Sequence, residues 1–352
     1  MTPYLVLLLI VVYLTYLGRR NGSKGVQLLN ISIIILILVL FAGLRHRLVG
    51  TDTGNYIRMF FDTNSMSDIW ETTEVSFNAL MLLAKNISTN YASLLTLIAL
   101  VVVSFYISTI VRLTKYYETG VFIFITLGAY TFFFNGARQG IAAAICFFAI
   151  PWLLERKPRQ YFLLIALAYT FHNTALIALP LYFLAIPRVG WRQVAIVAGS
   201  TVVTILFLTV FVQFAADALN DKYAAYAEVS EGGGMVMTTF LVGQGALLFL
   251  VRKQIKNSNG NYERLLNIYL IGLIPVVASV ISHVNPSGLL RLHPYFAYMA
   301  ILLWPMFFQS MKNIKQRRIL SLVFALVMLS FYYLATKSFS NLAPYSINMS
   351  IL

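Results

Sequence analysis

The chain has 352 residues, of which 59% are hydrophobic and only 11% are charged. Together with a mean hydropathy of +0.78, this composition excludes an ordinary soluble domain and indicates a polytopic membrane protein. A net charge of +14 would suggest nucleic acid as a partner of a soluble chain. In a membrane protein Lys and Arg first set the orientation, so we predict no nucleic-acid partner.

About 20 residues are needed to cross the hydrocarbon core of a bilayer, and the apolar runs predict ten such spans. In chain order they are residues 2–17, 27–44, 91–112, 119–136, 138–154, 191–214, 237–251, 265–283, 292–310 and 318–335. Segment 160–187 is too long for one ordinary span, and Pro180 interrupts it. It predicts a tight hairpin of two short helices that turn near His172 and Asn173. The expected fold is an all-α bundle of about 12 membrane segments in one transmembrane domain.

The basic residues favour this arrangement, because Lys and Arg collect in cytoplasmic loops. It places most of the 26 basic residues on the cytoplasmic side, whereas a single span over 160–187 would move the basic turns 252–264 and 312–318 outside. The predicted topology has both termini outside. Two outer loops, 45–90 and 215–236, then form the active-site side, and residues 77–87 are expected to lie along the membrane interface.

Some arginines depart from this charge rule because they lie at the outer ends of predicted spans. They are Arg45, Arg47, Arg138 and Arg291. A charge at that depth is costly unless it meets an anion or faces water, although each guanidinium can also extend to the lipid headgroups.

Arg138 lies in the stretch NGARQGIAAA, where Gly136, Gly140 and Ala144 form a stripe of small residues. Such a stripe lets a neighbouring helix approach closely. At the helical angle of about 100° per residue, Arg138 lies roughly opposite the stripe. We therefore expect its guanidinium to point toward a cavity or lipid, of which a cavity is the less costly.

Two outer residues are candidate acid–base groups. His172, in FHNTALIALP, can serve as a base, although a lone histidine is more often a hydrogen-bonded packing residue. Asp52, in VGTDTGN, either shapes a turn or places a carboxylate beside the arginines. The sequence contains no HExxH, paired CxxC or GxSxG motif, and we predict neither a metal nor a cofactor.

Several arginines with a few acid–base groups at the outer face fit a lipid-linked diphosphate, because guanidinium forks bind phosphate bidentately. The departure of a diphosphate creates negative charge that fixed guanidinium groups stabilise. A transferase on that side also needs a lipid-borne donor, because nucleotide sugars are absent there.

Five short stretches resemble the EpsG-type branch of the bacterial Wzy polysaccharide polymerases. They are LRHRLVGTDTGNY, Glu74 with the following SFNAL, ARQGIAAAI, FHNTALIALP and RLHPYF. The resemblance implies a multi-pass protein of the bacterial cytoplasmic membrane that polymerises oligosaccharide units carried on undecaprenyl diphosphate. Its active site would face the periplasm or outside, with membrane lipids and a chain-length regulator as further partners.

The resemblance also implies roles for individual residues. Arginines would hold the diphosphate, and His172 or Asp52 would activate the acceptor hydroxyl, with a slight preference for His172 because a neutral imidazole suits the operating pH. The residues expected to bind the diphosphate or the glycan are Arg45, Arg47, Arg138, Gln139, Arg291, Tyr56, Glu74 and Tyr295. Glu74 and Tyr56 are expected to order the loop or bind sugar. Two alternatives stay open: a lipid-linked glycan ligase of the O-antigen type and a glycan flippase or transporter.

Overall fold

The computed structural model describes residues 1–20, 23–63, 74–207, 234–255, 260–283 and 288–349. These residues form helices and contain no strand; their one β-type pairing is an isolated bridge between Arg45 and Ile347. The predicted all-α fold is thus confirmed for the described residues. By internal packing the chain divides into two compact units. The first unit comprises residues 1–179 and 312–352, and the second comprises residues 180–311.

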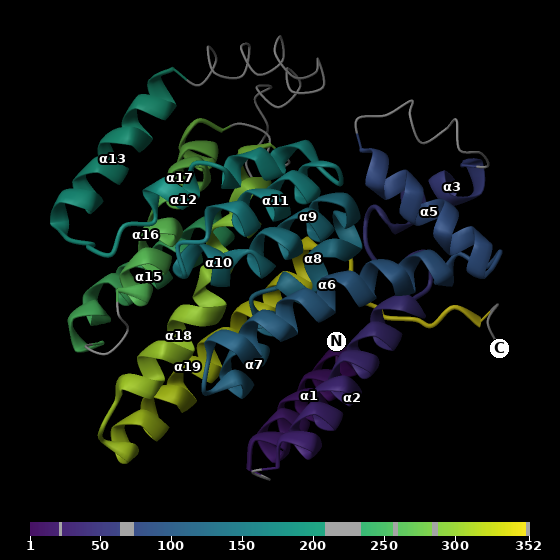
Figure 1. The fold of residues 1–352 in the computed structure, drawn as a ribbon, viewed down its shortest axis with the longest axis horizontal. Coiled ribbons are helices and arrows are strands. Elements are labelled where there is room, and N and C mark those ends of the chain that lie inside the picture. Colours follow the sequence, from purple (N-terminus) through teal and green to yellow (C-terminus); the bar gives the residue numbers. More distant parts are fainter. Residues whose placement is uncertain (21–22, 64–73, 208–233, 256–259, 284–287, 350–352) are drawn as a thin grey trace. The chain divides into compact units, whose positions relative to one another are not determined.

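The first unit holds the two N-terminal helices, a central group of helices and one C-terminal helix (Figure 1). In chain order they are α1 (Thr2–Arg20), α2 (Lys24–Gly43), α3 (Thr53–Asp62), α5 (Val75–Ile87), α6 (Ala92–Leu113), α7 (Tyr117–Thr126), α8 (Ala129–Asn135), α9 (Ala137–Phe148), α10 (Ile150–Leu154), α11 (Pro158–Tyr169), η1 (Asn173–Ala178), α19 (Ile314–Leu334) and η6 (Ala335–Phe339). Gly128 separates α7 from α8, and its φ of +84° belongs to the left-handed region that favours glycine. Breaks of this kind turn long apolar runs into consecutive shorter helices.

The second unit is also helical. Its helices are α12 (Leu181–Leu184), α13 (Trp191–Leu206), α15 (Met235–Val251), η3 (Arg252–Gln254), α16 (Asn261–Ile271), α17 (Leu273–Ile281), η4 (Leu289–Tyr295), η5 (Ala297–Met299) and α18 (Ala300–Ser310). The prediction of one continuous span over 292–310 is wrong, because two 3-10 helices precede α18 there. Pro294 supplies the physical reason: proline has no amide hydrogen to donate and disfavours the α conformation of the preceding residue.

Eight helical stretches of the described residues are long and apolar enough to cross a membrane. They are Thr2–Arg20, Lys24–Gly43, Ala92–Leu113, Tyr117–Asn135, Ala137–Leu154, Met235–Gln254, Asn261–Ile281 and Ile314–Ser338. Each overlaps a predicted span, which confirms a polytopic membrane protein. The count of about 12 membrane segments is not reached: Val75–Ile87, Asn173–Leu184 and Trp191–Leu206 are shorter apolar helices, and the predicted end of span 191–214 and most of outer loop 215–236 lie outside the described residues.

The predicted turn near His172 is present in the first unit. Helix α11 ends at Tyr169, and η1 begins at Asn173 and packs back against α11. The hydroxyl of Tyr161 in α11 donates a 2.7 Å hydrogen bond to the carbonyl oxygen of Ala178 in η1. This bond satisfies a buried phenol and holds the two short segments together.

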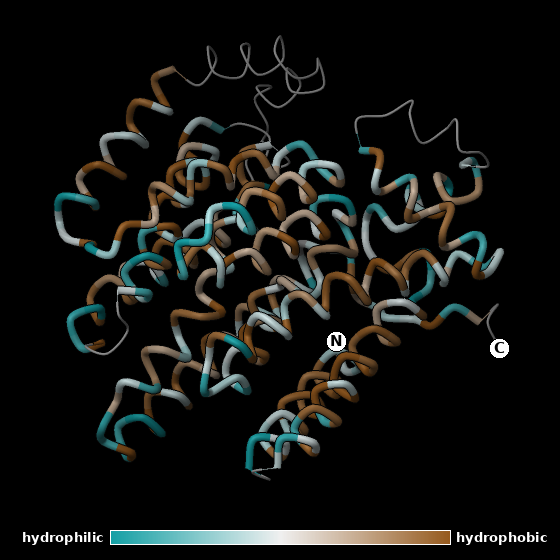
Figure 2. Tube along the Cα trace, viewed as in Figure 1, coloured by the Kyte–Doolittle hydropathy of each residue, from teal (hydrophilic) through white to brown (hydrophobic). Residues whose placement is uncertain are grey.

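Ion pairs gather at one end of the first unit. Arg19 at the end of α1 pairs with Glu118 at the start of α7 over 2.9 Å, and Arg112 at the end of α6 pairs with Glu155 over 2.6 Å. These residues were all predicted to share the cytoplasmic side. Figure 2 shows hydrophilic residues where α1 and α2 meet and apolar residues along their lengths.

The opposite end of the first unit holds both terminal segments. The amide of Asn348 donates to the carbonyl of Leu44 over 2.8 Å, and the hydroxyl of Tyr4 donates to the carbonyl of Leu342 over 2.8 Å. Tyr345 stacks on Phe41, with ring centroids 4.1 Å apart. The two terminal segments therefore share one end of this unit, while their location on the outer side of the membrane stays a prediction.

Candidate functional site

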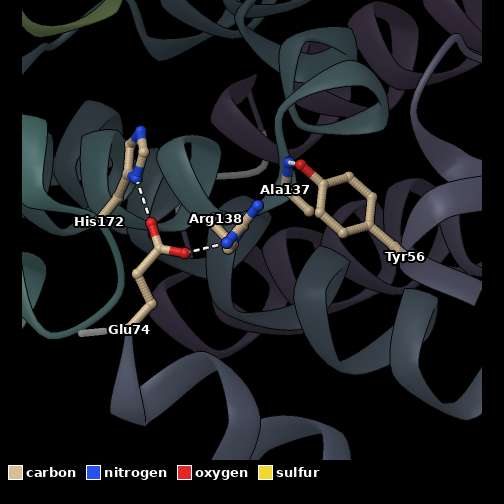
Figure 3. Close-up of polar contacts among 5 residues, drawn as sticks. All are labelled: Tyr56, Glu74, Ala137, Arg138 and His172. Carbon is tan, nitrogen blue, oxygen red and sulfur yellow. Dashed lines mark hydrogen bonds and ion pairs between the residues drawn. The ribbon is translucent and has the colours of Figure 1, made fainter. Parts of the chain in front are cut away.

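Glu74 lies between a histidine and an arginine side chain in the first unit (Figure 3). Its Oε1 is 2.5 Å from Nδ1 of His172, and its Oε2 forms an ion pair with Nη1 of Arg138. The carboxylate side chain is only 12% exposed, against 25% for His172 and 37% for Arg138. We call Glu74, Arg138 and His172 the Glu74 cluster.

Three separate chain segments bring the cluster together. Glu74 immediately precedes α5, Arg138 lies in the first turn of α9, and His172 lies in the turn between α11 and η1. Turn geometry fixes the histidine backbone, since its amide donates to Ala168 and its carbonyl accepts from Ala175. The positive end of the α9 dipole lies on the same side as Arg138, which adds to the favourable potential for an anion.

Gly140 in α9 allows the close helix contact that the sequence predicts. A Cβ atom at Gly140 would lie 2.5 Å from Cβ of Phe133 in α8, so only glycine fits there. Arg138 is two residues away on a different face of α9, where it meets Glu74. The prediction that Arg138 points away from the close helix contact is confirmed, and its partner is a carboxylate of the protein itself.

The pKa of Glu74 is lowered from its ordinary value of 4.5. Burial alone raises the pKa of this carboxyl, but the hydrogen bond from His172 and the positive charge of Arg138 outweigh burial. The carboxyl is therefore ionised at neutral pH and only accepts hydrogen bonds. Nδ1 of His172 must then carry the hydrogen, which leaves the lone pair of a neutral imidazole on Nε2.

Arg138 keeps hydrogen-bonding capacity beyond its ion pair. A guanidinium has five N–H donors, and this side chain is 37% exposed while one nitrogen contacts Glu74. The guanidinium carbon also lies 6.0 Å from the ring centroid of Phe77. The exposed edge of Arg138 is suited to a bidentate contact with phosphate oxygens.

Tyr56 supports the helix that carries Arg138. Its phenol oxygen accepts a 3.0 Å hydrogen bond from the amide of Ala137, the first residue of α9. Burial raises the pKa of Tyr56, although the charge of Arg138 lowers it in part, so the phenol is neutral. Tyr56 thus satisfies one of the free amides at the start of α9, while its expected role in ordering the loop or binding sugar stays a prediction.

Asp52 lies at the beginning of α3, the helix that holds Tyr56. Its backbone carbonyl accepts hydrogen bonds from the amides of Asn55 and Tyr56, and its negative charge raises the pKa of Tyr56 further. Of the two predicted bases, His172 contacts a carboxylate, that of Glu74. The turn interpretation of Asp52 agrees with its position, while a chemical role for it stays a prediction.

Arg45 occupies a different environment from the one expected. Its side chain is completely buried; Nη1 donates to the carbonyl of Ala42 over 2.5 Å, and the guanidinium lies 4.1 Å from the ring centroid of Phe134. A group without exposed surface cannot contact a diphosphate in this structure. The expectation of a diphosphate contact is therefore corrected: Arg45 belongs to the packing at the end of α2.

The other predicted ligands lie at separate positions. Arg47 is exposed just after α2, and Gln139 is buried in α9 beside Arg138. Arg291 is exposed and Tyr295 is buried, both in η4 of the second unit. The expected contacts of these residues with a diphosphate or glycan stay predictions. Tyr223 and Tyr226, in the predicted outer loop 215–236, carry rings of the kind that stack on sugars, and they lie outside the described residues.

A model of the EpsG family matches residues 28–347, which is most of the chain. The chain belongs to the EpsG family. This family is associated with polysaccharide polymerase-like proteins, so the protein is a membrane protein of polysaccharide biosynthesis. No curated protein and no solved structure matches the chain. Among the residues that the structure describes, no three or more His, Cys, Asp or Glu side chains gather as metal ligands.

Proposed function

We propose that this EpsG-family protein polymerises oligosaccharide repeat units carried on undecaprenyl diphosphate. It uses one lipid-linked glycan as donor and another as acceptor, in surface polysaccharide or O-antigen biosynthesis. The site faces the outer side of the bacterial cytoplasmic membrane. The observation that carries the proposal is the Glu74 cluster, in which one carboxylate contacts both a histidine and a partly exposed arginine.

His172 acts as the general base in the proposed reaction. Its Nε2 takes the proton of the acceptor hydroxyl as the oxygen attacks the anomeric carbon of the growing chain. Glu74 holds the hydrogen on Nδ1 and stabilises the imidazolium that forms. The new glycosidic bond forms as the bond from the anomeric carbon to the diphosphate oxygen breaks, and undecaprenyl diphosphate leaves with the electron pair.

Arg138 stabilises the departing diphosphate. Negative charge grows on that group in the transition state, and a guanidinium that is already oriented by Glu74 stabilises it without reorganisation. Arg291 lies in η4 of the second unit, and its diphosphate contact is a separate proposal that rests on the sequence. Its test is the Arg291→Ala variant, which loses elongation while the protein still inserts into the membrane.

The decisive experiment supplies purified protein in lipid nanodiscs with lipid-linked repeat units alone. The expected result is a ladder of elongated products without nucleotide sugar or added metal. An absolute requirement for either would contradict the proposal. A ligase would instead transfer a preformed chain to a different acceptor and give no ladder, so product length distinguishes the two activities.

A further inference from the structure

A second pair of contacts lies beside the Glu74 cluster. The amide of Ser76 donates to the carbonyl of Thr170 over 3.1 Å, and the two side-chain hydroxyl oxygens are 2.7 Å apart. Ser76 is two residues after Glu74, and Thr170 is two residues before His172. The two chain segments are therefore joined at matching positions: Ser76 with Thr170, and Glu74 with His172.

The direction of the hydroxyl contact follows from a third hydrogen bond. Oγ1 of Thr170 donates its hydrogen to the carbonyl of Leu167 over 2.7 Å. Because a hydroxyl has a single hydrogen, Thr170 must accept from Ser76. The result is a chain of hydrogen bonds from Ser76 through Thr170 to the last turn of α11.

This pair joins segments that have different packing neighbours. Helix α5 packs against α3 and α6, whereas α11 packs against α9, α10 and η1. Glu74 and His172 are 98 residues apart in the chain, so local sequence does not hold them in register. A connection next to the cluster restricts their relative shift, and a shift of about 1 Å at a reacting group can cost on the order of 100-fold in rate.

We infer that Ser76 and Thr170 are positioning residues that set the register of the Glu74 carboxylate against Nδ1 of His172. As a contribution to catalysis this inference rests on the proposed function. The claim that Ser76 and Thr170 set which ring nitrogen of His172 carries the hydrogen does not depend on the proposed function. Neither hydroxyl touches the substrate in this assignment.

The first test measures the tautomer of His172, which does not depend on the reaction. The 15N spectra of three proteins labelled with 15N-histidine are compared at a pH where the ring is neutral. The proteins are the wild type, the Glu74→Gln variant and a double variant that combines Ser76→Ala and Thr170→Val. The signals of His172 are assigned with His172→Gln. We expect the Nδ1–H form to dominate in the wild type and to fall in the double variant toward its level in Glu74→Gln. An unchanged tautomer ratio in the double variant would overturn the inference.

The second test measures elongation in a double-mutant cycle. Ser76→Ala should lower the elongation rate about tenfold when Glu74 is present, a fraction of the loss for a full misplacement of the base. In the Glu74→Gln background, Ser76→Ala should lower the elongation rate hardly any further. Equal losses in both backgrounds would show that Ser76 acts elsewhere.

Matched variants exclude a general loss of folding. Ser76→Thr keeps the hydroxyl and should keep most of the rate, and Ser310→Ala removes a part-buried hydroxyl that donates to Phe307 and should leave the rate unchanged. If the wild type gives no ladder, the proposed function fails, but the 15N spectrum still decides whether the pair positions Glu74.

Discussion

Arg45 and Arg138 were both expected to hold a diphosphate, yet the structure places them in opposite environments. Arg45 is completely buried among a backbone carbonyl, the hydroxyl of Thr53 and the ring of Phe134. Arg138 keeps 37% of its side chain exposed and pairs with a carboxylate. Both follow the end of an apolar helix, so sequence position alone does not separate them.

The kind of partner explains the difference. Burial lowers the pKa of Arg45 to about 10, yet the group stays charged at neutral pH, stabilised by neutral dipoles and an aromatic face. Such an arrangement is enclosed by the protein and structural, although Nε of Arg45 has no hydrogen-bond partner among the described residues. A partly exposed guanidinium beside an ionised carboxylate and an imidazole can still bind another anion, and clustered ionisable groups of this kind are common at functional sites.

The largest expected effect is on the base. His172→Gln should lower the elongation rate by about 10²- to 10⁴-fold, the usual contribution of a general base. The measurement is the initial rate with purified lipid-linked units, with insertion and unfolding temperature checked in parallel. A variant that elongates at the wild-type rate would remove His172 from the mechanism and leave Asp52 as the candidate base.

Removal of the Arg138 guanidinium should have the next largest effect. Arg138→Ala should lower the elongation rate by about 10²- to 10³-fold, because the departing diphosphate loses a preorganised donor. Arg138→Lys keeps a charge without the planar fork and should recover only part of the rate. Full activity of Arg138→Lys would show that charge alone is needed. Full activity of Arg138→Ala would contradict the assignment of Arg138 as a ligand of the departing diphosphate.

Arg45→Met should affect stability more than chemistry. The substitution removes a buried hydrogen bond and a cation–π contact, so we expect a loss of about 2 kcal/mol in unfolding free energy. The matched control is Arg47→Gln at the neighbouring exposed position, which should change stability by less than about 0.5 kcal/mol. If Arg45→Met abolishes elongation while the protein keeps its wild-type stability, the contrast between a structural Arg45 and a functional Arg138 is wrong.

The smallest expected effect is a shift in pH dependence. Because the pKa of Glu74 is lowered on folding, its stabilising contribution is present above the ordinary value of 4.5 and is lost as pH falls through the lower folded value. Arg138→Gln removes one cause of the lowering, so the loss should be smaller and should be complete at a higher pH. Unfolding temperatures between about pH 3 and 7 measure it, with Glu74→Gln as the control that lacks the transition. A shift toward lower pH would contradict the assignment.

Helix spans were largely predictable because they depend on local composition. The apolar run of α2 is visible in the sequence, because a spanning helix needs about 20 apolar residues. The turn near His172 is visible because segment 160–187 is too long for one span and Pro180 interrupts it. The break over 292–310 was missed although Pro294 marks it. Greater weight on the proline would have found it.

The partner of Arg138 was not predictable in the same way. The sequence predicted that Arg138 would point toward a cavity or lipid and bind a diphosphate, not that it would pair with a carboxylate of the protein, and Glu74 is only one of several acidic residues in the first outer loop. The contacts of Glu74 join residues 64 and 98 positions apart, and no periodic pattern encodes such pairs. Ser76 and Thr170 were missed for the same reason, since a single hydroxyl carries no sequence signal.

The amino-acid sequence by itself determined that this is a helical membrane protein, that arginines lie at the ends of its apolar runs and that a histidine lies in a turn, because hydropathy and charge act locally along the chain. Only the tertiary structure decided which arginine is enclosed by the protein and which keeps exposed surface. Burial and partner chemistry depend on segments that meet across the fold, and they separate Arg45 in its packed site from Arg138 in the Glu74 cluster.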